Sequence, residues 1–180
     1  KNISQIKTRP IKTFNEYKDN IMFELEKSVK LQTISDVPIG CFLSSGVDSS
    51  LIASILQSQS NSSIRTFSVG FKDNNYNEAN KSKKISNYLG TDHHELYINN
   101  EDMINLVFDL KNIYSEPFAD SSQIPTCLLS KLTSEHVKVV LSGDGADEIF
   151  GGYNRHFIAN KIKYNNLFFK IPKNIRVFLS

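Results

Sequence analysis

The sequence contains no apolar run that approaches the ~20 residues needed to cross a lipid bilayer. Its N-terminus, Lys1-Asn2-Ile3-Ser4-Gln5, has neither an initiator Met nor the hydrophobic core of a signal peptide. We therefore expect a cytoplasmic protein without a membrane partner. We also expect the chain to be a fragment or excised domain of a longer protein, with residues 1–12 as an arm or linker.

Cysteine is scarce, since Cys41 and Cys127 are the only two and share no CxxC spacing. A disulfide between them has no support in the sequence, and reduced thiols in a cytoplasmic protein are the favoured interpretation. Cys41 lies inside an apolar run, which predicts a small core residue.

No excess of one charge is present either: 21 basic and 19 acidic side chains give a net charge of +2. The two signs are mixed along the chain, which argues against a nucleic-acid partner or a polybasic membrane anchor. The 180 residues, of which 39% are hydrophobic, are enough for one domain with a real core. No internal repeat or low-complexity tract is visible.

Short apolar runs alternate with segments of helical periodicity. A capping box at Thr13 and Glu16 opens the first helix, whose predicted apolar stripe includes Phe14, Tyr17 and Val29. Asn100 is the expected N-cap of a later helix, and Gly90 the expected C-cap of another. Strands are predicted over residues 37–43, 65–71, 94–98 and 137–141, and the other helices over residues 51–56, 78–89, 103–110 and 124–134 and from Tyr153.

This alternation is typical of βαβ units. It predicts an α/β fold in which a parallel, twisted sheet is covered by helices on both faces, as in Rossmann-like domains. Ligands of such sheets bind at the carboxyl ends of the strands, near a topological switch point. The first and fourth predicted strands end in loops rich in Gly, Ser and Asp, so these loops are the candidate site.

The first loop, Ser44 to Ser50, consists mostly of small residues and opens a helix. Its backbone N–H groups and hydroxyls suit a phosphate, and Asp48 beside a phosphate suggests an intervening cation, as in a magnesium nucleotide. The alternative is an ordinary strand-to-helix turn with Ser49 as N-cap, and from the residues alone the two interpretations are equally supported.

The second loop runs from Ser142 to Gly152 and holds four glycines. It begins like a dinucleotide fingerprint, but Glu148 stands where the third glycine belongs, which argues against a dehydrogenase. The first loop lacks the Gly-Lys-Ser/Thr ending of a P-loop. In the alternative interpretation, the glycines only form turns and Asp147 and Glu148 only begin a helix.

The histidines are interpreted as structural. His93 and His94 are adjacent on a predicted strand and so point to opposite faces. His136 and His156 have no partners at metal-ligand spacing.

Together the loops resemble a known family. Leu43-Ser44-Ser45-Gly46-Val47-Asp48-Ser49-Ser50 is similar to the SGGxDS loop of the N-type ATP pyrophosphatases. Residues 142–153 resemble the SG[ED]GxDExFGGY element of glutamine-hydrolysing asparagine synthetases, and residues 36–40, 67–71 and 116–120 are also similar to that family. The resemblance extends from about Phe14 to Phe157 and implies an adenine nucleotide alpha-hydrolase-like fold.

The resemblance implies an ATP-dependent amide ligase that adenylates the side-chain carboxylate of aspartate, releases pyrophosphate and forms asparagine with ammonia from a glutaminase domain. It implies ATP and Mg²⁺ as cofactors, with Asp48 and Asp147 on the metal and Asp144 at the acyl centre. The residues implied around the nucleotide are Leu43, Ser44, Ser45, Gly46, Asp48, Ser49, Ser50, Val69, Gly70, Ser142 and Gly143.

Three departures from the family pattern limit what the resemblance implies. Ser45 replaces the first glycine of the loop and can present its N–H only with a negative φ. The glutaminase half and the C-terminal part are absent, so residues 13–180 are expected to form only part of a synthetase domain. Two alternatives stay open, a related amidotransferase for another carboxylate (a sugar acid or peptide) and a non-catalytic ATP-binding fragment. A homodimer of the full-length protein is also left open.

Overall fold

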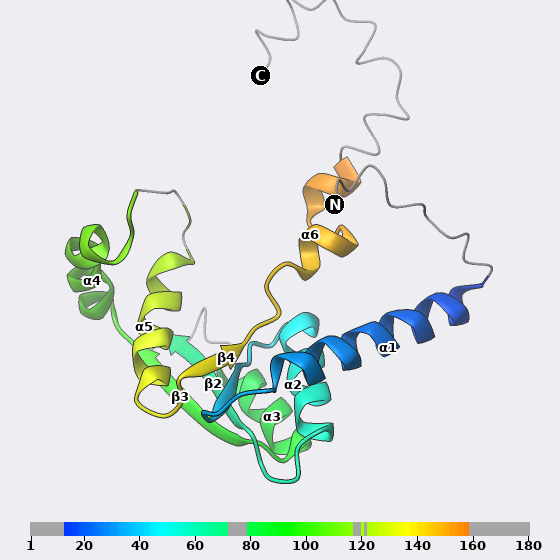
Figure 1. Ribbon diagram of the computed structural model, residues 1–180. Coiled ribbons are helices and arrows are strands. Elements are labelled where there is room, and N and C mark those ends of the chain that lie inside the picture. Colours follow the sequence, from blue (N-terminus) through cyan, green and yellow to red (C-terminus); the bar gives the residue numbers. More distant parts are fainter. Residues whose placement is uncertain (1–12, 72–78, 117–119, 121, 159–180) are drawn as a thin grey trace, which may run out of the picture. The chain divides into compact units, whose positions relative to one another are not determined.

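The computed structural model describes residues 13–71, 79–116, 120 and 122–158. The chain divides into two compact units, Lys1–Gly143 and Asp144–Ser180. The first unit holds the sheet and most of the helices, and the second begins inside the glycine-rich second loop (Figure 1). The predicted arm, residues 1–12, lies outside the described residues.

The first unit is built on a four-stranded parallel sheet, which confirms the predicted fold class (Figure 1). The strand order is β3-β2-β1-β4, and every neighbouring pair is parallel. The chain moves outward from β1 to β3 and then crosses to the far side of β1, so the switch point lies between β1 and β4. The strands are β1 (Ile39–Phe42), β2 (Arg65–Phe71), β3 (Asp92–Ile98) and β4 (Val139–Leu141).

The described part of this unit has five helices, close to their predicted positions, of which the first precedes β1 and the other four connect strands: α1 (Phe14–Gln32), α2 (Val47–Ser58), α3 (Ala79–Leu89), α4 (Asn100–Ile113) and α5 (Gln123–Ser134). The predicted capping box is present, because the Thr13 side chain accepts from the Glu16 N–H and the Glu16 carboxylate accepts from the Thr13 N–H. Gly90 follows α3 with φ at 74°, a left-handed conformation that suits the predicted C-cap.

Two local predictions are wrong. The N-cap of α4 is Asn99 rather than Asn100, because Asn99 exchanges hydrogen bonds with Asp102 in a capping box. The second loop is not all irregular, since a short helix, α6 (Ala146–Phe150), forms inside it. In α6 the acidic residues Asp147 and Glu148 occupy the first turn, as the helix-start alternative predicted.

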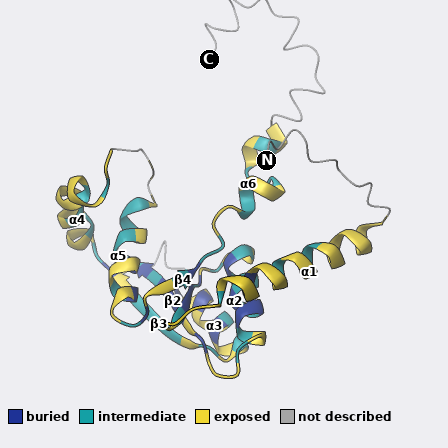
Figure 2. Cartoon of the chain, viewed as in Figure 1, coloured by how far each residue is buried: buried dark blue, intermediate teal, exposed yellow. Residues whose placement is uncertain are grey.

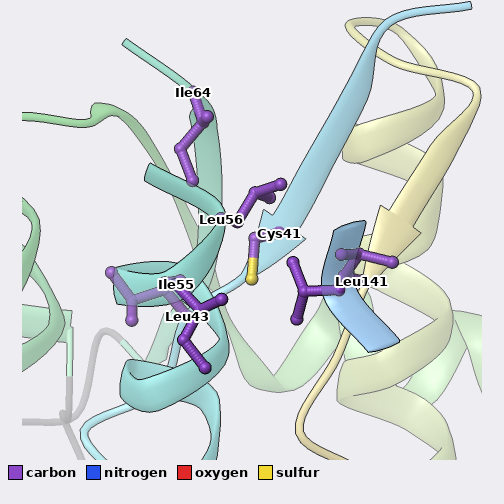
Figure 3. Packing of buried hydrophobic residues seen from close by; sticks show 8 residues of the cluster. Cys41, Leu43, Ile55, Leu56, Ile64 and Leu141 are labelled. Atoms are coloured by element: carbon purple, nitrogen blue, oxygen red, sulfur yellow. The ribbon is translucent and has the colours of Figure 1, made fainter. Parts of the chain in front are cut away.

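One face of the sheet carries the larger apolar core. Cys41 and Leu43 at β1 and Leu141 on β4 pack with Ile55 and Leu56 of α2 (Figure 3). Ile85 and Leu89 of α3 and Val29 of α1 join the same cluster. Burial raises the pKa of the Cys41 thiol to about 12, and both cysteines are free thiols, as predicted.

The opposite face is covered by α5. Phe67 of β2 is fully buried there with Leu129 of α5 and with Val137, and Phe42, Val69 and Val140 pack around them. Because Cys41 and Phe42 belong to opposite clusters, β1 is buried on both sides, which explains its nearly continuous apolar sequence. Helices on both faces of the sheet are thereby confirmed.

The outer parts of α1 and α4 are solvent-exposed (Figure 2). Val29 is the one buried residue of α1, while Phe14 and Tyr17 of the predicted stripe are exposed. No residue of α4 is buried. Among the described residues, no helix combines the length and apolar character needed to cross a membrane.

Gly40 of β1 lies against the Phe67 ring on the α5 side of the sheet. A Cβ atom at Gly40 would lie 2.7 Å from the Phe67 ring and 3.2 Å from both the Arg65 carbonyl oxygen and Val137. We predict that Gly40→Ala lowers the free energy of unfolding by about 1–3 kcal/mol, because the fully buried ring has no room to move. Urea unfolding measures this, with exposed Ser63→Ala as control, and equal stability of the two variants would contradict the packing argument.

Candidate functional site

The loop between β1 and α2 is held closed by its own hydroxyl groups. The Ser44 N–H donates to Ser49 Oγ at 3.1 Å, and the two hydroxyl oxygens lie 2.7 Å apart. Ser50 Oγ donates to the Gly46 carbonyl at 2.7 Å. Ser49 is buried, so its hydroxyl fixes the loop from inside.

The same arrangement leaves the start of α2 without a side-chain cap. The N-cap is Gly46, which has no side-chain oxygen to offer, and helical residues begin at Val47. Ser49 is therefore the third helical residue, and the alternative that made it the N-cap is wrong. No described non-glycine residue has a positive φ, so Ser45 meets the condition for presenting its N–H. An uncapped helix start of this kind favours an anion through its first-turn N–H groups and its dipole.

The loop after β4 comes directly against this helix start. A Cβ atom at Gly143 would lie 2.7 Å from the Ser49 nitrogen and 2.9 Å from the Asp48 carbonyl carbon. Only a residue without a side chain fits at that distance, since backbone atoms cannot move aside as a flexible side chain can. The structure thus brings two predicted site segments together at the switch point between β1 and β4.

The end of β2 presents main-chain groups beside the same loop. The pairing of β1 with β2 ends with the Leu43 N–H donating to the Phe67 carbonyl at 2.8 Å. Since strand residues alternate in direction, the N–H and C=O of Val69 point to the same side as those of Phe67, beyond the end of β1. On its other side, β2 stays paired with β3 through Phe71.

Asp144 and Asp147 belong to the second unit. Gly145, with φ at 91°, precedes α6 and Gly151, with φ at 71°, follows it, so both glycines have the turn-forming role considered from the sequence. A Cβ atom at Gly152 would overlap the Asp147 carboxylate, and the Gly152 N–H donates to the Asp147 carbonyl at 3.0 Å. Gly152 therefore lies directly beneath the carboxylate that was predicted to bind metal.

Sequence reasoning did not single out the contacts that follow α6. The Tyr153 hydroxyl donates to Glu148 Oε1 at 2.6 Å, and this hydrogen bond lowers the pKa of the Glu148 carboxyl. The Arg155 guanidinium lies 4.2 Å from the centre of the Tyr153 ring, a cation–π contact. A five-residue spacing between a glutamate and a tyrosine is not a recognised sequence signal, so this pair could not be predicted from the sequence.

The histidines of the sheet lie as predicted on opposite faces. His93 contacts hydroxyl groups on the α3 side, whereas His94 stacks on Phe67, with ring centroids 5.3 Å apart, on the α5 side. The His136 ring packs against His94 with centroids 4.4 Å apart and an angle of 36° between the ring planes. Within the described ranges, no three side chains of His, Cys, Asp or Glu gather as metal ligands.

The predicted site residues therefore fall into two groups. Those of the first unit gather around the ends of β1, β2 and β4: Leu43, Ser44, Ser45, Gly46, Asp48, Ser49, Ser50, Val69, Gly70, Ser142 and Gly143. Asp144 and Asp147 form the second group, in the second unit. Part of the similar segment at residues 116–120 lies outside the described residues.

Comparison with known proteins agrees with this architecture. The asparagine synthase family model matches residues 21–175. Asparagine synthetase 1 of Bacillus subtilis, of the glutamine-hydrolyzing type, is 35% identical over 178 residues, which are 99% of this chain and 27% of that protein. A Methanocaldococcus jannaschii protein named putative asparagine synthetase 2, of the glutamine-hydrolyzing type, is 40% identical over 154 residues. These are 85% of this chain and 29% of that protein.

The chain therefore belongs to the asparagine synthase family, and it spans less than a third of the length of these two relatives. A solved glutamine-dependent NAD+ synthetase from Acinetobacter baumannii, in complex with ADP, shares the fold at a TM-score of 0.50. It is 18% identical, and the match covers 82% of this chain and 29% of that one. This likeness supports the predicted adenine nucleotide alpha-hydrolase-like fold.

The close approach of Gly143 to α2 can be tested by adding one methyl group. We predict that Gly143→Ala displaces the first turn of α2 and lowers the free energy of unfolding by about 1–3 kcal/mol. Amide hydrogen exchange should accelerate at Ser50, whose N–H donates to the Gly46 carbonyl at 3.3 Å, while the amides of β3 keep their protection. If Ser50 exchanges at the wild-type rate in this variant, the added methyl group does not displace the helix start and the packing argument is wrong.

Proposed function

We propose that this chain is the nucleotide-binding part of an ATP-dependent amide ligase that adenylates the side-chain carboxylate of aspartate. The observation that carries the proposal is the meeting of an uncapped helix start and the Gly143 turn at the switch point between β1 and β4, with the Val69 main chain beyond the end of β1 on its other side. Membership of the asparagine synthase family supports aspartate as the carboxylate.

The leaving pyrophosphate is assigned to the loop from Ser44 to Ser50. Its hydroxyl groups hold the loop in shape, so the backbone N–H groups at the start of α2 are available for phosphate oxygens. Because these donors are in place before the reaction, they stabilise the charge that develops on the leaving group without reorganising.

The adenine ring is assigned to the end of β2. Beyond the last hydrogen bond of the β1–β2 ladder, Val69 has an N–H and a C=O facing the loop side, a donor and acceptor pair that suits an adenine edge. Leu43, Gly70, Ser142 and Gly143 are proposed to complete the nucleoside contacts.

The carboxylates of Asp48 and Asp147 would hold Mg²⁺, which when bound neutralises charge on the phosphates. Carboxylate oxygens suit a hard cation such as Mg²⁺. Within the described residues, neither carboxylate takes part in a salt bridge or accepts a hydrogen bond. Asp144 is proposed to act at the acyl centre, where ammonia from a glutaminase domain would attack. A cytoplasmic location and a homodimer of the full-length protein complete the proposal.

Binding of ATP is the first prediction of this proposal. Mg-ATP at a hundred times its dissociation constant should stabilise the purified chain by roughly 2.7 kcal/mol, seen as a higher thermal midpoint. Mg-GTP at equal concentration should give a smaller shift, because a guanine edge reverses the donor and acceptor pattern offered to Val69. A folded chain whose midpoint stays unchanged with millimolar Mg-ATP would refute the assignment.

Magnesium sharing makes a second, separate prediction. Asp48→Asn and Asp147→Asn should each weaken Mg-ATP binding about tenfold to a hundredfold, and the double variant should be little worse than either alone. Without Mg²⁺ the same variants should bind ATP at least as well as the wild type, because a carboxylate that repels phosphate has been removed. Titration calorimetry measures both conditions, with exposed Asp109→Asn as control, and independent losses that persist without Mg²⁺ would exclude a shared metal.

A further inference from the structure

A chain of buried polar groups lies between α3 and the sheet, on the face that also carries the larger apolar core. His93 Nδ1 lies 2.9 Å from Thr66 Oγ1, and His93 Nε2 lies 3.1 Å from Ser68 Oγ. Thr66 Oγ1 also contacts Thr91 Oγ1 at 2.9 Å, which in turn lies 2.7 Å from Ser86 Oγ. The His93 side chain is 6% exposed, so both ring nitrogens depend on these hydroxyl groups.

The two hydroxyl groups that His93 contacts belong to the part of β2 that leads into the nucleotide site. Pairing with β1 ends at Phe67, so residues 68–71 of β2 have β3 as their sole strand neighbour in the described part of the chain. Ser68 is the first of these residues and directly precedes Val69. Its contact with His93 is therefore a side-chain tie between the free half of β2 and β3.

We infer that His93 is a positioning residue for the adenine site, holding Ser68 so that the Val69 main chain keeps its orientation. This inference rests on the proposed function, and it assigns to His93 a role in nucleotide affinity beyond its contribution to the fold. The Nε2–Ser68 contact carries that role, whereas the Nδ1–Thr66 contact, at a position paired with both neighbouring strands, contributes to stability.

Charged groups surround His93, but burial has the larger effect on its protonation. Glu95 Oε1 lies 3.9 Å from His93 Nε2, Lys83 of α3 pairs with Glu95 Oε2 at 3.4 Å, and His94 and Asp92 complete the charged surroundings. Burial lowers the pKa of His93 below its usual 6.5 and outweighs the attraction of Glu95. The neutral ring thus predominates at pH 7. As the pH falls, His93 of the unfolded chain takes up a proton before His93 of the folded chain does. The free energy of unfolding therefore decreases as the pH falls below 6.5.

Two amide replacements separate the contacts of the ring. In His93→Gln the carboxamide reaches the position of Nε2 and can keep the contact with Ser68, whereas in His93→Asn it reaches only the position of Nδ1 and Thr66. We expect His93→Asn to weaken Mg-ATP binding about three- to tenfold and His93→Gln by less than about twofold. Ser68→Ala should match His93→Asn, and the two together should cost no more than one alone.

Titration calorimetry of the folded chain at pH 7.5 distinguishes the possible failures. His94→Gln, on the opposite face of the sheet, should bind Mg-ATP as the wild type does. If Mg-ATP does not bind at pH 7.5, the proposed function fails. If it binds but Asn and Gln at position 93 leave its affinity equal, while both lower the thermal midpoint, His93 is only structural and the inference is overturned.

Discussion

The whole candidate site depends on where β1 stops. This strand has four residues, and its pairing with β2 ends with a single hydrogen bond from Leu43 to Phe67. Because β2 continues for four more residues, its main chain beyond that point has no strand neighbour on the β1 side within the described residues. The chain leaves β1 and soon begins α2. Because β1 ends early, the start of α2 lies beside the edge of β2 that β1 does not cover. A longer β1 would cover the edge and move the helix away.

The two faces of the sheet are packed in different ways. On the α5 side, the Phe67 ring fills the core, and the absence of a side chain at Gly40 leaves space for it. On the α3 side, small side chains such as Ser82 and Ser86 bring the helix close, and hydroxyl groups satisfy the buried imidazole of His93. Polar contacts of this kind need correct geometry to offset desolvation, so they specify the position of a strand more narrowly than apolar packing does. The arrangement explains why a polar cluster lies on the strand that precedes the open edge.

Sequence reasoning succeeded where a pattern is local. Apolar runs predicted the four strands, the Thr13–Glu16 spacing predicted a capping box, and the adjacency of His93 and His94 predicted opposite faces. It failed where two neighbouring residues compete for one role, as Asn99 and Asn100 do for the N-cap of α4. It was silent on contacts that tertiary packing creates. Nothing in the letters around Gly143 indicates that Ser49 lies within van der Waals distance, and the tie between Ser68 and His93 joins residues 25 positions apart.

The buried thiol of Cys41 has a practical consequence. A thiol reacts with alkylating reagents as the thiolate, and burial keeps Cys41 protonated at any ordinary pH while the core closes around it (Figure 3). Alkylation at Cys41 must therefore wait until β1 and α2 separate, whereas the partly exposed Cys127 is accessible without that event. The rate of Cys41 alkylation therefore reports how often β1 separates from α2, and Cys127 on α5 serves as the reference thiol.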